Sequence, residues 1–73
     1  MSAHSTAYRR FLVRLRQARV GAELTQVDVA RRLGKPQSFI SKCESGERRV
    51  DVVELAQLAT LYRKPVAWFL RRS

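Results

Sequence analysis

The side chains that could perform covalent or acid–base chemistry are few in this sequence and far apart. It has one cysteine, Cys43, and one histidine, His4, so no Ser–His–Asp or Cys–His arrangement is credible. A lone thiol forms neither an internal disulfide nor a cysteine-rich zinc site. The six acidic residues are scattered, which leaves no oxygen cage for a metal. We therefore expect a protein that is not an enzyme and that uses no cofactor.

The cations give the strongest compositional signal. Fifteen Lys and Arg residues against six Asp and Glu give a net charge of +9 in 73 residues. Such an excess of positive charge usually indicates that a protein binds a polyanion, most often nucleic acid, although a solvated basic face has the same composition. The 45% hydrophobic content is too high for a disordered basic tail. The length suits one small domain, and no apolar run approaches the roughly 20 residues of a membrane span.

The first 22 residues allow two interpretations, because they carry five arginines and no acid. That composition also suits a mitochondrial transit peptide, although the same segment can form an amphipathic helix of the domain. A removable presequence would show the same helical spacing of apolar residues, so this spacing does not distinguish the two interpretations. We expect a flexible tail over residues 1–5, containing His4, and a single domain over 6–73. The apolar stripe consists of Tyr8, Phe11, Leu12, Leu15 and Ala18.

Short helices with brief connections are expected along the rest of the chain. The first should run from Ser5 or Thr6 to Val20, with Gly21 as its stop signal. The second should cover 25–33, with a threonine cap at its start. The third should begin at residue 36 or 37, where a proline can open a helix, and should end at residue 44.

Two more helices are expected towards the end of the chain. Asp51 and Glu54 have the spacing of a capping box at the start of the fourth helix. Pro65 opens a short fifth helix, in which we expect Phe69 to lie inside and Trp68 nearer the surface, with Val66 and Leu70 in the same cluster. The predicted buried stripe of the fourth helix is Val52, Leu55, Leu58, Ala59 and Tyr62.

The spacing from Gln26 to Cys43 is the most informative pattern. If Gln26 is position one, Ala30 is the fifth residue, Gly34 the ninth, Ile40 the fifteenth and Cys43 the eighteenth. Two helices that cross near a right angle through a short turn need a small residue where they touch, which Ala30 supplies. The turn needs a positive φ, which Gly34 accepts without steric cost. Ile40 and Cys43 would then face the core, where an inert thiol is favoured over a redox switch.

This is a helix-turn-helix pattern, and further residues along the chain agree with one family that carries it. They are Leu15, Arg19, Leu24-Thr25-Gln26, Ala30, Leu33-Gly34, the run Ser38-Phe39-Ile40-Ser41-Lys42-Cys43-Glu44-Ser45-Gly46, and Leu55, Leu58 and Ala59. From Leu15 to about Leu70 the chain resembles the phage repressor and Cro-type, or Xre-like, helix-turn-helix domains. The resemblance implies an all-α, compact, lambda-repressor-like bundle of five helices.

The resemblance also implies how such a domain works. The helix at about 36–44 would enter the DNA major groove as the recognition helix, and the domain would usually act as a homodimer on two half-sites. Two positions depart from the family pattern. Cys43 stands where a larger residue is common, and Pro36 replaces a serine or threonine that would cap the recognition helix.

Four polar residues of the recognition helix are expected to contact bases: Gln37, Ser38, Ser41 and Lys42. In this docking mode the N-terminal residues of the helix reach base edges. Glutamine can bind adenine N6 and N7 through two hydrogen bonds, and lysine can donate to guanine O6 and N7. A merely solvated polar face is the alternative. Phe39 is expected to lie partly in the core and partly against a thymine methyl group.

Five residues are expected to contact phosphates, which positions a protein on DNA without reading its sequence. Gln26 and Thr25 stand at the start of the second helix, where backbone N–H groups and the helix dipole favour an anion. Lys35, Arg48 and Arg49 lie on turns that flank the recognition helix. Ordinary surface charge is the alternative for each of these three cations.

Arg19 and Glu44 form the last predicted pair. The family commonly has an arginine near the end of the first helix and a glutamate at the end of the recognition helix, and both positions are filled here. We expect a partly buried, bidentate ion pair that fixes the recognition helix against the first helix. Its role would be structural.

These features predict a sequence-specific DNA-binding transcriptional regulator, a bacterial or phage repressor that binds an inverted-repeat operator as a homodimer. It would act in the cytoplasm, on the nucleoid, and not at a membrane. Two alternatives stay open. The same fold could serve as an antitoxin-type interaction module that binds a toxin or another partner protein as well as DNA. A basic membrane-surface or transit-type peptide could instead be attached to a small bundle.

Overall fold

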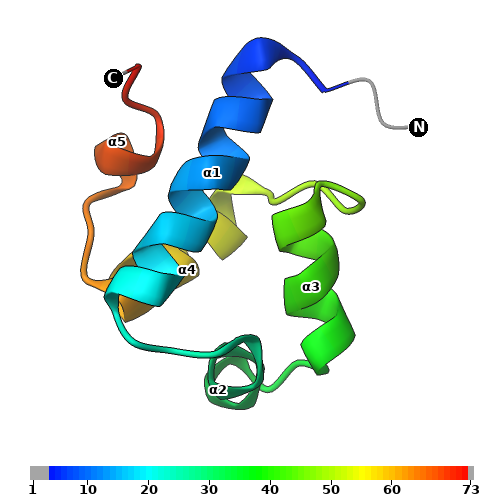
Figure 1. Ribbon diagram of the computed structural model, residues 1–73. Coiled ribbons are helices and arrows are strands. Elements are labelled where there is room, and N and C mark those ends of the chain that lie inside the picture. Colours follow the sequence, from blue (N-terminus) through cyan, green and yellow to red (C-terminus); the bar gives the residue numbers. More distant parts are fainter. Residues whose placement is uncertain (1–3, 73) are drawn as a thin grey trace.

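Five α-helices follow one another in the computed structural model, which describes residues 4–72 (Figure 1). Within that range there is no β-strand, so the predicted all-α class with five helices is confirmed. In Figure 1, α1 crosses in front of α4, while α5 and α3 lie on opposite sides of it. The helices are α1 (Thr6–Gly21), α2 (Gln26–Leu33), α3 (Gln37–Ser45), α4 (Val52–Tyr62) and α5 (Val66–Phe69).

Two helices begin with reciprocal capping boxes. The Thr25 hydroxyl accepts from the Asp28 backbone N–H at 3.0 Å, and the Asp28 carboxylate accepts from the Thr25 N–H at 2.9 Å. Asp51 and Glu54 make the same exchange at 2.8 and 3.0 Å, so this predicted box is confirmed. Each box satisfies two backbone donors that would otherwise lack a partner. Pro36 gives α3 no side-chain cap, again as predicted.

The helix ends agree with the sequence at two glycines and differ at a third. Gly34 and Gly46 are left-handed, with φ of 66° and 85°, and they end α2 and α3. The helix α1 does end at Gly21, one residue later than predicted, but Gly21 is not left-handed; the left-handed residue of this turn is Glu23, with φ of 61°. This later turn lets the Leu24 N–H bond the Arg19 carbonyl at 3.2 Å while the Leu24 side chain packs against the core.

All five helices contribute to the hydrophobic core. The predicted stripe of α1 faces inwards, with Tyr8 and Leu12 partly buried at its edge. Val52 is the exception to the stripe predicted for α4, because 81% of this residue is exposed. It stands at the first position of the helix, where it lines the mouth of a shallow groove instead of being covered. The buried residues are Phe11, Leu15, Ala18, Val29, Ala30, Ile40, Cys43, Leu55, Leu58, Ala59, Tyr62 and Phe69.

Both ends of the described range contact α1. Phe69 is 1% exposed and packs near Phe11, with 6.5 Å between their ring centroids, and Trp68 is only half-buried, as predicted. At the other end Ser5 caps α1, and His4 Nε2 donates to the Gly46 carbonyl oxygen at 2.6 Å. Residues 4 and 5 therefore have partners where the sequence indicates a flexible tail. Residues 1–3 of that segment lie outside the described residues.

Candidate nucleic-acid interface

The second and third helices form one packed unit. Ala30, Ile40 and Cys43, which the spacing predicts to be internal, are all buried, and Val29 is buried beside them. The turn between the helices is closed by the Lys35 N–H, which donates to the Ala30 carbonyl at 2.9 Å. The small side chain at residue 30 leaves room for this close approach. The structure therefore has the helix-turn-helix geometry that the sequence indicates.

The start of α3 presents a polar surface to solvent. Gln37, Ser38 and Lys42 are exposed, while Ser41 and Phe39 are half-buried. The four polar side chains can form hydrogen bonds, and none of them lies in the core. The structure thus brings the predicted base-contacting residues onto one short helix, although Ser41 reaches out less far than the other three.

Arg19 and Glu44 meet between α1 and the end of α3. Arg19 Nε donates to Glu44 Oε2 at 2.6 Å and Nη2 donates to Oε1 at 3.2 Å, which makes the pair bidentate. Only 12% of the Arg19 side chain and 7% of the Glu44 side chain are exposed. The hydrogen bond to Glu44 raises the pKa of the Arg19 guanidinium above its ordinary value. Arg19 Nη1 also donates to the Leu24 carbonyl at 2.9 Å, so one side chain connects α1 with the end of α3 and with the turn before α2.

The amides of Gln26 and Gln37 extend this pair to the surface. Gln26 Nε2 donates to Glu44 Oε1 at 3.1 Å, and Gln37 Nε2 donates to Gln26 Oε1 at 3.0 Å. Within residues 4–72, Gln37 Oε1 accepts no hydrogen bond. The family resemblance implied that Gln26 contacts phosphate and supports the recognition helix, but it did not name Gln37 as the residue that Gln26 contacts. The signal in the sequence was the presence of two glutamines at the starts of the two helices, which the packing of α2 against α3 brings together.

The predicted phosphate-contacting cations have different surroundings. Arg48 donates to both carboxylate oxygens of Glu54 at 2.9 and 2.8 Å, and its guanidinium lies 4.5 Å from the centroid of the Phe39 ring. Lys35 Nζ lies 5.1 Å from the centroid of the same ring. Arg49 lies instead over the Tyr8 ring, at 4.5 Å. Lys35 and Arg48 therefore gather beside α3, and Arg49 lies against α1.

The Arg48–Glu54 pair was missed because Glu54 was assigned to the capping box alone. In the structure its carboxylate serves both purposes, since it accepts from the Asp51 N–H and from Arg48. The Arg48 guanidinium, and after it the Asp51 N–H, hold the pKa of Glu54 below its ordinary value. In return the hydrogen bond to Glu54 raises the pKa of Arg48. The guanidinium is half-exposed, so it can still reach a phosphate at the surface.

Cys43 lies in the core under this surface. It is 2% exposed, and burial raises the pKa of its thiol above the ordinary value. Arg48 Nη1 lies 4.0 Å from its sulfur. Within residues 4–72, no group of three or more His, Cys, Asp or Glu side chains is placed to hold a metal ion. In the same range, none of the helices has the length and apolar character needed to cross a membrane.

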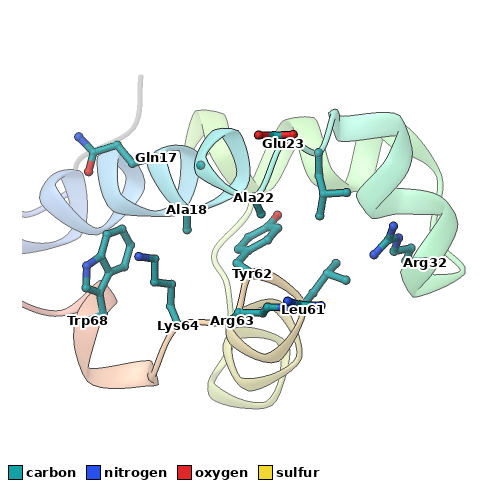
Figure 2. Close-up of a pocket in the computed structure, with 12 residues that line it drawn as sticks. Gln17, Ala18, Ala22, Glu23, Arg32, Leu61, Tyr62, Arg63, Lys64 and Trp68 are labelled. Atoms are coloured by element: carbon teal, nitrogen blue, oxygen red, sulfur yellow. The ribbon is translucent and has the colours of Figure 1, made fainter.

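A pocket of about 630 Å³ lies on another part of the molecule (Figure 2). It shares no residue with the polar surface of α3, and Trp68, Lys64 and Tyr62 stand along one side of it. Its cations Arg63 and Lys64 directly follow α4, and Arg32 belongs to the last turn of α2. Cations at these positions complement the negative ends of the helix dipoles. The charge of the pocket therefore has a structural explanation.

Comparison with known proteins agrees with this geometry. No curated protein matches the chain significantly. Residues 10–67 match a helix-turn-helix domain family, a span that contains α2, α3 and α4 in full and most of α1. The match covers most of the 73 residues, and it includes the Arg19–Glu44 pair and both glutamines. The chain therefore belongs to this family of helix-turn-helix domains.

Proposed function

We propose that the protein is a sequence-specific DNA-binding transcriptional regulator, and that α3 is its recognition helix. The observation that carries the proposal is the hydrogen-bonded path from Arg19 through Glu44 and Gln26 to Gln37. A side chain on a merely solvated face needs no such support. Holding Gln37 in place before DNA arrives reduces the rotamer entropy that is lost when a base contact forms.

The remaining groups of Gln37 match one base in particular. Its Nε2 has a second N–H besides the one donated to Gln26, and its Oε1 is an acceptor. Adenine offers an N7 acceptor and an N6–H₂ donor at its major-groove edge, so both groups of the amide can be used. Ser38 and Lys42 are exposed on the same helix and would contact neighbouring base pairs. Ser41 would contribute less because it is half-buried.

Phosphates would be held around this surface. The first turn of α2 has backbone N–H groups without partners in the helix, next to Thr25 and Gln26, and its dipole favours an anion there. Lys35 and Arg48 stand beside α3, while Arg49 is exposed over α1. These contacts would orient the domain and would add equally to the affinity for every sequence.

The biological action would follow from occupancy of the DNA. A homodimer would place two recognition helices in successive major grooves, about 34 Å apart, and would select an inverted repeat. Binding over a promoter would exclude polymerase, which makes repression the proposed outcome. This action would need neither catalysis nor a cofactor, and the protein would act in the cytoplasm, on the nucleoid.

Selection from random duplexes, followed by titration in increasing salt, tests this proposal. We expect one preferred inverted-repeat sequence, bound by two chains. We also expect the logarithm of affinity to fall linearly with the logarithm of salt concentration, by about 0.9 for each phosphate contact. Equal affinity for all duplexes would contradict the proposal. A single chain on a site without symmetry would contradict its homodimer part.

A further inference from the structure

The solvent side of α1 carries a second pattern, which DNA recognition by α3 does not use. Arg9, Val13, Arg16 and Val20 follow one another at intervals of four, three and four residues, so they lie along one line of the helix. All four are exposed, with 56% of Val13 and 58% of Val20 accessible. We call these four residues the α1 ridge. It alternates a cation with an apolar side chain along most of the longest helix.

The two valines of the α1 ridge are not part of the hydrophobic core. β-Branched residues lose rotamer freedom in a helix, and other residues form exposed helical surfaces more favourably. The hydrophobic core is already served by Phe11, Leu15 and Ala18 on the opposite side of α1. An apolar partner that covers Val13 and Val20 would supply the burial that they lack.

The α1 ridge also borders an apolar groove of about 620 Å³. Leu12 forms part of this groove, and Glu44 closes it at the end of α3. The Glu44 carboxylate is already engaged by Arg19 and Gln26, so it does not require a cation from a partner. The groove and the valines together make a surface long enough for one side of a partner helix. The groove lining is Leu12, Val13, Arg16, Gln17, Val20, Gly21 and Glu44.

The net charge of this surface is positive, because its acidic residue, Glu44, is paired with Arg19. α1 contains five arginines and no acidic residue. Arg19 is paired with Glu44, and within residues 4–72 neither Arg9 nor Arg16 forms an ion pair. A second copy of this chain would bring arginines against arginines, with a net charge of +9 on each copy. Charge complementarity therefore selects an acidic partner over a second copy.

We propose that the α1 ridge is a docking site for an acidic amphipathic helix of another protein. Apolar side chains at i, i+3 or i+4, and i+7 of that helix would cover Val13 and Val20 and enter the groove. Flanking Glu or Asp side chains would pair with Arg9 and Arg16. The site shares no residue with the proposed base and phosphate contacts, so α3 stays accessible to DNA. This interaction goes beyond the proposed function and does not require it.

A labelled synthetic peptide provides the test. It is a helix of about 18 residues with leucines at the spacing above and glutamates beside them, and a second peptide has lysines in place of the glutamates. We expect the glutamate peptide to bind the full chain and to shift the amide resonances of Val13, Arg16 and Val20. We expect the lysine peptide not to bind. Binding of both peptides, or of neither, would overturn the proposal.

Paired variants separate this site from general attraction to a basic protein. Val13→Ala with Val20→Ala should lower peptide affinity about tenfold, since four apolar methyl groups are lost from the contact. Alanine favours helix, so the fold should persist, which a thermal melt can verify. The matched control is Val52→Ala with Val53→Ala, because these valines of α4 are 81% and 65% exposed. Equal losses in the two pairs, or no loss in the first, would overturn the proposal.

Charge variants and a DNA titration complete the design. Arg9→Gln with Arg16→Gln should weaken the peptide at least fivefold more than Arg71→Gln with Arg72→Gln, which removes the same charge elsewhere. The Val13/Val20 variant should keep its full affinity for duplex DNA. If that variant loses duplex affinity and peptide affinity by the same factor, the α1 ridge is a DNA contact and the docking proposal fails.

Discussion

Gln37 Nε2 on α3 donates a hydrogen bond to Gln26 Oε1 on α2 at 3.0 Å, so Gln26 holds the exposed side chain of Gln37 from across the turn. Gln26 is held in turn by Glu44, whose carboxylate Arg19 binds through two hydrogen bonds. A path of polar contacts thus joins α1 to the surface of α3.

The Arg19–Glu44 pair should stabilise the fold cooperatively. Arg19→Ala and Glu44→Ala should each lower the free energy of unfolding by about 2–3 kcal/mol, because each leaves one largely buried charge without its partner. The double variant should lose less than the sum of the two losses, with a coupling energy of about 1–3 kcal/mol. Urea unfolding of the four proteins measures this coupling. Additive losses would show that the pair contributes no specific interaction.

Arg48 and Glu54 should affect DNA affinity without changing the preferred sequence. Arg48→Gln should weaken every duplex by a similar factor, because a phosphate contact carries no sequence information. Glu54→Gln should strengthen every duplex, since it removes a negative charge and releases the guanidinium that now bonds both carboxylate oxygens. Titrations with the preferred site and with a scrambled duplex compare the two effects. A change in the ratio of these affinities would assign Arg48 to base recognition instead.

Acid should destabilise the protein through its helix starts. The Thr25 backbone N–H and hydroxyl hold the pKa of Asp28 below its ordinary value, and Arg48 does the same for Glu54. A carboxyl group whose folded-state pKa is lowered stabilises the fold above its unfolded pKa, and this stabilisation is lost as pH falls through the folded value. Stability should therefore be level above about pH 5 and should fall below about pH 4.

Two neutral variants test this assignment. Asp28→Asn and Glu54→Gln should lower stability at pH 7 and should flatten the decline in acid, because the replaced group no longer titrates. Thermal melts between about pH 2 and pH 7 are sufficient. A decline that is equally steep in both variants would show that other groups control acid unfolding.

Cys43 should behave as an inert core residue. Its burial raises the pKa of the thiol, so little thiolate forms at neutral pH, and the reagent cannot reach the sulfur in the folded protein. A thiol-specific disulfide reagent should react slowly with the native chain and rapidly in denaturant. Rapid modification of the native chain would contradict the placement of this residue.

Features that depend on neighbouring residues were predicted well from the sequence. The box of Asp51 and Glu54 and the left-handed turn at Gly34 are set by groups within a few positions of each other. The buried residues of α2 and α3 also followed from their spacing, because two crossing helices demand it. The end of α1 at Gly21 was predicted to within one residue, but the left-handed turn lies at Glu23, next to Leu24, which packs against the core.

Features that depend on competition between distant side chains were not predictable. Arg48 had two potential partners, a phosphate and Glu54, and only the fold brings the carboxylate within 2.8 Å. Periodicity placed Val52 on the buried side of α4, but the first two residues of that helix, Val52 and Val53, are left exposed. Gln26 satisfied every local criterion for a phosphate ligand, while the crossing of α2 and α3 gave it Glu44 and Gln37 as partners.

We propose that α3 reads bases through the Gln37 amide, which Gln26 holds in place. The most direct measurement compares base preference in Gln37→Ala and in Arg49→Ala, by titrating each variant with the selected duplex and with every single substitution of one half-site. We predict that Gln37→Ala loses about 1–3 kcal/mol of discrimination at one base pair, whereas Arg49→Ala weakens all duplexes alike. Unchanged discrimination at every base pair in Gln37→Ala would show that Gln37 does not read a base.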